Sequence, residues 1–403
     1  MKKTIPVVSS VVILIQLAAV DLQAIPAFAR KYQMTCKTCH TPFPKLKPYG
    51  DEFAANGYVI KDKDAPRYTI DTGDDFLSLI RDLPLAVRLD GFVTYNNSAT
   101  KQLDFASPFM MKFLSGGEIT KNVSYFFYFI FSEMGEIAGI EDAFLMFNNL
   151  FGSGFDFYIG QFQVSDPIFK RELRLTLEDY QIFSTEVGES SVNLTYDRGV
   201  MLSYDLPSQT TLTLEVVNGS GIGQANIFRN LDSDKYKNLI LRVSQDIGKD
   251  FRIGGFSYLG KEEKENIGNS LRMLGVDATI AAKPFELNLQ YVDRRDGNPN
   301  FGIFNLIPPE SIKTRGGFGE LIYLPRGDDS KWYLAGLYNW VSSAFDELDY
   351  SSATVHYGRM LRRNIRATAE FTYVFDSIYK DYGRFALGLI TGFYNKKGPP
   401  HFP

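Results

Sequence analysis

The chain has 403 residues and a formal net charge of −4 at pH 7, with 44% hydrophobic, 14% aromatic and 22% charged residues. This charge balance excludes the basic footprint of a nucleic-acid-binding protein, so no nucleic-acid partner is expected. High aromatic content without high overall hydrophobicity is typical of strands that face lipid on one side and water on the other.

The first 24 residues predict export. Lys2 and Lys3 precede an apolar stretch at residues 5–20, and Ala24 ends a plausible cleavage site, so residues 1–24 are interpreted as a signal peptide. Leu22 is larger than such a site prefers, which leaves the exact cleavage position open, and an uncleaved membrane anchor is the alternative to a signal peptide. No later run of about 18 apolar residues predicts a transmembrane helix.

The motif CKTCH at residues 36–40 contains both cysteines of the chain. Two cysteines at this spacing can form thioethers to the vinyl groups of one haem, and the following histidine can ligate its iron. Cys36 and Cys39 are therefore predicted to attach one haem c, with His40 as the proximal ligand. A zinc site would need more ligands, a thioredoxin-type motif would need a βαβ context, and a disulfide would leave the histidine unexplained.

Residues 25–60 are predicted to form a small α-type cytochrome segment around this motif. The candidate haem-pocket residues, which flank the motif on both sides, are Phe28, Tyr32, Met34, Phe43 and Tyr58. So short a segment cannot hold a core unaided, so covalent haem would stabilise it. Residues 61–84 are interpreted as a linker or periplasmic element, in which apolar spacing at 74–84 predicts a short helix.

Beyond residue 84 the apolar residues alternate with polar ones. At 285–291, for example, Phe, Leu, Leu and Tyr oppose Glu, Asn and Gln, and a period of two with one apolar and one polar face indicates a strand. About sixteen such segments predict an all-β outer-membrane barrel over residues 85–394, followed by a tail at 395–403. The expected strands are 85–95, 105–114, 122–131, 140–148, 154–163, 191–204, 210–217, 237–246, 251–259, 269–281, 285–293, 316–324, 331–341, 350–360, 364–375 and 384–394. A β-sandwich would require an apolar inner face, which this pattern lacks.

The connections between these segments alternate in length. If the first strand rises from the periplasm, the short connections 205–209, 247–250 and 282–284 are periplasmic, and the long ones at 164–190, 218–236 and 294–315 are external. This arrangement places the protein in the outer membrane of a Gram-negative bacterium, with the cytochrome segment inside the barrel or on its periplasmic side. The charged stretch 169–179 is expected to be a solvated loop, and inward folding that narrows the lumen is the alternative.

The distal ligand of the haem is open. His356 shares a strand face with Thr354 and Gly358, and it is expected to line the lumen, with distal ligation or iron binding as the alternative. Met34 lies close before Cys36, which makes ligation awkward, and a vacant or water-filled position is also compatible with the motif. Carboxylates at 261–265 and 346–349 are expected in ordinary acidic loops, although hard oxygen ligands there could collect Fe(II).

Residues 25–58, IPAFARKYQMTCKTCHTPFPKLKPYGDEFAANGY, resemble the N-terminal segment of the fused outer-membrane cytochrome–porins. That family includes the monohaem iron oxidases of Fe(II)-oxidising bacteria. The matching features are Phe28-Ala29-Arg30, the CxxCH motif, Phe43-Pro44, Gly50, Phe53 and Gly57-Tyr58. The resemblance covers about 35 residues, and the barrel matches only as architecture.

The resemblance implies electron transfer across the outer membrane through a single haem. Fe(II) or another extracellular donor would supply the electron, and a soluble periplasmic cytochrome would accept it, which amounts to Fe(II):cytochrome c oxidoreductase activity. Outer-membrane lipid would surround the barrel. Two alternatives stay open, namely a porin in which haem is a structural plug or redox sensor, and outward electron flow to an extracellular acceptor.

Overall fold

The computed structural model describes residues 28, 32, 34–60, 69–74, 77–80, 84–98, 102–302, 311–362, 364–376 and 381–393. The predicted signal peptide and the C-terminal tail lie outside these residues, as does most of the predicted linker. Within the described ranges, no helix is both long enough and apolar enough to cross a membrane.

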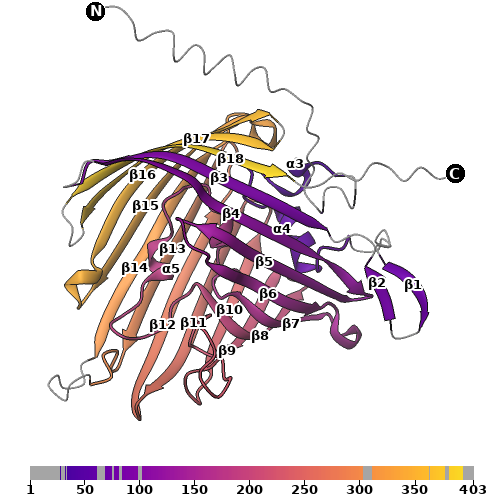
Figure 1. The fold of residues 1–403 in the computed structure, drawn as a ribbon, viewed down its shortest axis with the longest axis horizontal. Coiled ribbons are helices and arrows are strands. Elements are labelled where there is room, and N and C mark those ends of the chain that lie inside the picture. The colour runs from indigo at the N-terminus through magenta and orange to yellow at the C-terminus, as the bar shows by residue number, and fades with distance from the viewer. Residues whose placement is uncertain are drawn as a thin grey trace, which may run out of the picture.

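A closed barrel of sixteen antiparallel strands forms the body of the molecule (Figure 1). The strands are β3 (Leu85–Asn96), β4 (Gln102–Thr120), β5 (Val123–Glu133), β6 (Gly139–Phe147), β7 (Phe155–Gln163), β8 (Tyr196–Leu206), β9 (Thr210–Val217), β10 (Asn238–Ile247), β11 (Phe251–Lys264), β12 (Ile267–Ile280), β13 (Phe285–Asp296), β14 (Ile312–Tyr323), β15 (Trp332–Ser343), β16 (Tyr350–Arg362), β17 (Ile365–Asp376) and β18 (Tyr382–Phe393). Each strand pairs with its neighbours in sequence, and β18 closes the barrel on β3. The predicted all-β barrel and its strand count are confirmed, and every expected span overlaps an observed strand. The cytochrome nature of the N-terminal segment stays a prediction.

Alternation of side chains along the strands explains why the sequence closes into a barrel. On β13, Asn288 and Gln290 are 2% and 5% exposed, whereas Leu289 between them is 42% exposed. On β16, His356 is 2% exposed and its neighbour Val355 is 61% exposed. Polar side chains thus face the interior and apolar ones face outward, which is the reverse of a water-soluble sandwich and suits a lipid surround.

The two ends of the barrel differ in their connections. The turns at 121–122, 207–209, 248–250 and 281–284 lie at one end, which we call the short-turn end. The connections at 164–195, 218–237 and 297–311 lie at the opposite end, the long-loop end. The predicted alternation of short and long connections is therefore confirmed.

Residues 164–195, which join β7 to β8, fold into the barrel instead of leaving it, and we call them the inward loop. The loop contains η2 (Arg171–Leu173) and α5 (Gln181–Ser184). Phe183 is 0% exposed and packs edge-on against Phe318 of β14, at 5.6 Å between ring centroids. The expectation of a solvated loop at 169–179 is wrong, because apolar residues interspersed with its charges find an inner wall to pack against.

A second correction concerns the predicted short helix at 74–84. The chain instead forms a two-stranded hairpin outside the barrel, β1 (Thr69–Asp74) and β2 (Leu77–Ile80), paired from Thr69↔Ile80 to Asp74↔Leu77. Leu77 is 52% exposed, so a helix here would have had no surface for its apolar face. Isolated short helices are marginal without such packing, and β-branched partners in the neighbouring strand favour the hairpin.

The N-terminal segment, residues 34–60, contains α3 (Cys36–Cys39) and α4 (Pro48–Ala55), which pack on each other. Gly50 of α4 lies so close to α3 that a Cβ atom would sit 2.3 Å from the Cys39 carbonyl oxygen. Only a glycine permits this approach. Gly50 therefore allows α4 to pack directly against the helical turn that contains the cysteine motif.

Candidate functional site

The cysteine motif forms a single turn of helix. Cys36 and Cys39 bound α3, so their side chains are three residues apart and lie on the same face. Both are free thiols and half-buried. His40 follows directly, and its backbone N–H donates to the Cys36 carbonyl at 2.9 Å, which fixes the histidine at the end of the turn.

The imidazole of His40 is oriented by a backbone acceptor. Its Nδ1 lies 2.6 Å from the Pro44 carbonyl oxygen, and since a carbonyl only accepts, Nδ1 carries the proton and Nε2 keeps its lone pair. Burial lowers the pKa of His40 to about 4, so the ring is neutral near pH 7. Two thiols on one helical face could form thioethers to a haem, and a neutral imidazole of this tautomer could ligate its iron, so the residues present fit that group.

Aromatic side chains gather beside the motif. Phe28 stacks on Tyr58 with 4.5 Å between ring centroids, and Tyr32 meets Phe53 edge-on at 5.6 Å. Tyr58 in turn stacks on Phe126 of β5 at 5.0 Å, which joins the cluster to the barrel wall. The structure thus brings together three of the five predicted pocket residues, and their contact with haem stays a prediction.

The other two predicted pocket residues lie elsewhere in the segment. The Phe43 ring packs edge-on against the His40 ring, with 4.9 Å between centroids. The Met34 sulfur lies 4.0 Å from the Tyr49 hydroxyl, and Tyr49 is not part of the aromatic cluster around Phe28. Among the described residues, no group of three or more His, Cys, Asp or Glu side chains could hold a metal ion.

The N-terminal segment touches opposite walls of the barrel near the short-turn end. On one side, Asn148 after β6 donates its amide to the Ala55 carbonyl at 2.9 Å. On the other, Lys45 pairs with Glu286 of β13, and Lys47 pairs with Asp328 at 3.2 Å. Because β6 and β13 are seven strands apart in a ring of sixteen, a segment that contacts both sides reaches across the lumen.

Gly57 allows the closest of these wall contacts. Its φ is +67°, a left-handed conformation that favours glycine, and a Cβ atom there would lie 2.2 Å from the Ser124 hydroxyl oxygen of β5. The predicted family feature Gly57-Tyr58 therefore has a physical role in this chain. The glycine lets the backbone approach β5 while Tyr58 stacks on it.

A chain of hydrogen bonds runs from the N-terminal segment to the inward loop. Arg366 of β17 donates to the Phe43 carbonyl at 2.6 Å and to the Tyr333 hydroxyl at 2.8 Å. The Tyr333 hydroxyl lies 3.3 Å from Nε2 of His356, whose Nδ1 lies 2.8 Å from Glu370. The Glu370 carboxylate then accepts the backbone N–H groups of residues 177 and 178 at 2.7 and 3.0 Å.

This network defines the place of His356. The side chain points into the lumen, as expected, and both of its ring nitrogens already have hydrogen-bond partners. Sequence reasoning singled out His356 but not Arg366, Glu370 or Tyr333 as members of this network. Their assembly depends on the pairing of β15, β16 and β17, which no local pattern reveals.

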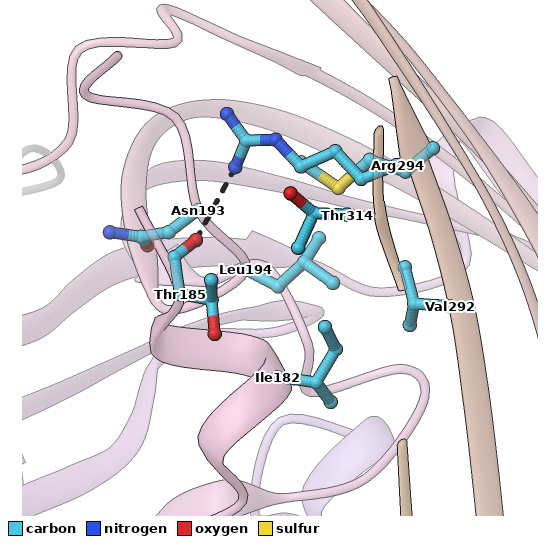
Figure 2. A pocket seen from close by; sticks show the side chains of 8 residues that line it. Ile182, Thr185, Asn193, Leu194, Val292, Arg294 and Thr314 are labelled. Atoms are coloured by element: carbon cyan, nitrogen blue, oxygen red, sulfur yellow. Dashed lines mark hydrogen bonds between the residues drawn. The ribbon is translucent and has the colours of Figure 1, made fainter. Parts of the chain in front are cut away.

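The inward loop is fastened to the wall by buried charges. Arg294 of β13 donates to the carbonyl oxygens of Thr185 and Val192 at 3.3 and 2.6 Å, and it pairs with Asp296 at 2.8 Å. Figure 2 shows this guanidinium above α5. The cavity beside it has a volume of only about 10 Å³. The loop therefore fills the lumen on this side and leaves room for about one water molecule.

The tip of the loop carries a second charge cluster. Glu172 pairs with Lys112 of β4 at 2.7 Å and faces the guanidinium groups of Arg171 and Arg174. Burial alone would raise the pKa of the Glu172 carboxyl, but Lys112, Arg174 and Arg171 together hold it well below its usual range. Glu172 is thus the anionic centre of a cationic cluster.

The acidic stretches expected in surface loops are partly structural. Residues 261–264 belong to β11, and Glu262 is 4% exposed and accepts from Asn269 at 2.9 Å. Asp346 lies in η4 (Asp346–Leu348) in the connection between β15 and β16. Both stretches are at the long-loop end. Glu262 also accepts a hydrogen bond from the backbone N–H of Ser191, at 3.3 Å, and so attaches the inward loop to β11.

Comparison with known proteins identifies the fold of the barrel. No family model and no curated protein matches the chain. The anion-selective porin from Comamonas acidovorans superposes with a TM-score of 0.57 at 10% identity, over 77% of this chain and 99% of that one. The outer membrane channel DcaP of Acinetobacter baumannii gives 0.55 at 12% identity, and Salmonella typhi OmpF in complex with daunomycin gives 0.55 at 11%, each over 77% of this chain and 97% of the other. The chain therefore contains a barrel with the fold of outer-membrane porins.

Proposed function

We propose that this chain is an outer-membrane electron-transfer protein in which a porin-type barrel holds one covalent haem c. The haem would be attached through Cys36 and Cys39 and ligated by His40. Fe(II) outside the cell is the proposed electron donor, and a soluble periplasmic cytochrome is the proposed acceptor. The observation that carries the proposal is the CxxCH turn, with its oriented neutral imidazole, held against opposite walls of such a barrel.

The location follows from the barrel surface and the fold. Apolar side chains such as Leu289 and Val355 face outward along the strands, and an outer membrane is the lipid surround that porin-type barrels suit. The short turns would face the periplasm, as short turns do in bacterial barrels. On that orientation, the N-terminal segment lies at the periplasmic mouth, where a soluble cytochrome has access.

The haem and the protein would have different roles in the proposed reaction. Bound haem c supplies a single one-electron centre. His40 would hold the iron through Nε2, because its Nδ1 proton is committed to the Pro44 carbonyl. Each Fe(II) would lose one electron and become Fe(III), and the periplasmic cytochrome would gain that electron.

A second candidate function is a channel. The named structural neighbours include an anion-selective porin and an outer membrane channel, which favours this reading of the barrel. Both the N-terminal segment and the inward loop lie across the lumen, which favours low conductance. Outward electron flow to an extracellular acceptor is the third reading, and the haem potential distinguishes it from the first.

The test uses full-length oxidised protein purified in detergent. Haem is first quantified by the pyridine haemochrome spectrum, with the Cys36→Ala/Cys39→Ala chain as a blank. Fe(II) is then added without oxygen, and the haem absorption bands are followed. Rapid reduction supports the oxidase reading. Haem that stays oxidised with Fe(II) and is reduced by dithionite contradicts it, and absence of covalent haem contradicts the whole proposal.

Conductance measured in a planar bilayer distinguishes the channel function from the electron-transfer function. Ion current that persists with haem in place and Fe(II) inert would favour a porin with a structural haem. Little current from the haem-loaded protein, together with reduction by Fe(II), would favour electron transfer.

A further inference from the structure

A cavity of about 40 Å³ lies between the tip of the inward loop and the inner wall formed by β3, β4 and β17. Its charged lining comprises four cations and two carboxylates, namely Arg88, Lys112, Arg174 and Arg366 against Asp90 and Glu172. Counting the Lys, Arg, Asp and Glu side chains, the lining carries two more positive than negative charges. Such an excess around an enclosed space is unusual, because buried charges without counterions are costly.

Two of the four cations are already matched. Arg88 donates to Asp90 through both Nε and a terminal nitrogen, at 2.8 and 2.6 Å. Lys112 donates to Glu172 at 2.7 Å. The unmatched positive charge of the lining is therefore that of Arg366 on the wall, whereas Arg174 on the loop lies 3.6 Å from both Glu172 and Asp179.

Arg366 has no carboxylate partner among the described residues. It is 2% exposed, and its hydrogen bonds go to two neutral acceptors, the Phe43 carbonyl and the Tyr333 hydroxyl. Its Nε–H is buried and has no hydrogen-bond partner within the described chain. A buried guanidinium in this state lacks an anionic acceptor, which a bound anion would provide.

Arg174, on the loop side of the cavity, has carboxylates nearby but shares one feature with Arg366, a buried donor that lacks a hydrogen-bond partner. Its Nε is also buried without a hydrogen-bond partner in the described residues, and the nearest Asp179 oxygen is 3.6 Å away. Glu172, at 3.6 Å from a terminal nitrogen of Arg174, is shared with Lys112. Two unpartnered donors on different elements thus line one cavity.

We propose that this cavity binds one small oxyanion, a carboxylate or phosphate group, between Arg366 and Arg174. The N–H groups of a guanidinium match the spacing between two oxygens of such a group. Their hydrogen bonds to an anion are charge-assisted and are stronger where water is excluded. The volume suits a group the size of a few water molecules. The anion would bridge the inward loop to β17, and through Arg366 to the N-terminal segment.

Two sources could supply this chemistry. One is a diffusible anion that enters the lumen, and the other is a carboxylate of the haem itself, an arm that rests on the proposed function. The sources are distinguished by comparing the haem-loaded chain with the full-length Cys36→Ala/Cys39→Ala chain. The anion site itself requires no haem chemistry, so it is tested independently of electron transfer.

The experiment is calorimetric titration of inorganic phosphate into full-length protein in detergent, at constant ionic strength. The Cys36→Ala/Cys39→Ala chain is expected to bind about one phosphate, and adding Arg366→Gln is expected to weaken binding at least about tenfold, as for a buried charged hydrogen bond. Arg366→Lys, which keeps the charge, should restore part of the affinity. Arg359→Gln, at an exposed arginine of β16, is the matched control and should leave binding unchanged.

Each outcome decides the proposal. Phosphate binding that depends on Arg366 in both haem-free and haem-loaded chains supports a diffusible anion. A haem carboxylate is supported if phosphate binds to the haem-free chain but not to the haem-loaded chain, and if Arg366→Gln shifts the haem potential of the haem-loaded chain. No phosphate binding to the haem-free chain, or binding unaffected by Arg366→Gln, overturns the site. If Arg366→Gln does not fold, Arg174→Gln in the loop provides the same comparison.

Discussion

The N-terminal segment and the inward loop both reach across the same lumen, yet they are held in different ways. The loop buries a hydrophobic core, with Phe183 and Val187 at 0% exposure, and Arg294 of β13, which donates to its carbonyl oxygens, forms an ion pair with Asp296 that is sealed from solvent. The N-terminal segment buries Phe53 but depends on outer ion pairs, such as Lys37 with Asp329, whose side chains are 59% and 87% exposed.

This difference indicates what each region needs. The inward loop is held by the polypeptide alone, since apolar burial is the dominant stabilising contribution. The N-terminal segment gains little from exposed ion pairs, which contribute about 0–1 kcal/mol each. A covalent cofactor would supply the missing apolar core, as metals and disulfides do in other very small domains. The predictions below test this contrast.

The largest expected effect is on the cofactor. Cys36→Ala/Cys39→Ala is expected to abolish covalent haem completely, because the chain has no other cysteine. The barrel should remain folded, since its sixteen strands pair without the segment. Denaturing gel electrophoresis with haem staining measures the first result, and heat-dependent gel mobility measures the second. A barrel that fails to form would show that the segment is required for folding of the wall.

The next effect concerns the core of the loop. Phe183→Ala is expected to lower the free energy of unfolding by about 3–5 kcal/mol, because it leaves a cavity at a fully buried position. Phe228→Ala is the control, since that ring is 76% exposed. Urea unfolding in lipid vesicles measures both variants. Equal, small effects at the two positions would mean that the loop is not packed as described, and haem content should be unchanged in both.

A pH effect should separate the two regions further. The pKa of Glu172 is depressed in the folded protein, so its contribution to stability is present above its ordinary value near 4.5 and is lost as pH falls below it. Acidification below about pH 4.5 is therefore expected to loosen the inward loop progressively. Limited acid proteolysis, with cleavage sites mapped by mass spectrometry, measures this. Glu172→Gln should flatten the pH dependence, and an unchanged profile would contradict the assignment.

The smallest expected effect is at the exposed ion pair. Lys37→Ala is expected to change the stability of the N-terminal segment by about 0.5 kcal/mol or less, because both partners are solvated. Haem content and the protease sensitivity of residues 34–60 are the measurements. A large loss on this single substitution would show that the segment is anchored by its ion pairs, and the contrast with the inward loop would then fail.

The sequence by itself determined the barrel. A period of two in side-chain polarity is a local property, and so are the turn lengths, and together they specified sixteen strands and which end carries the long loops. The CxxCH motif is equally local, because its residues are within one helical turn of one another. Such features can be predicted because neighbouring residues alone produce them.

Tertiary structure decided what fills the lumen. The charged stretch 169–179 resembles a solvated loop until Lys112 and Glu370, from distant strands, supply partners for it. The chain from Phe43 through Arg366 to His356 likewise joins residues far apart in sequence. These contacts exist only after the barrel closes, and their free energy comes from burial in a space that no local pattern describes.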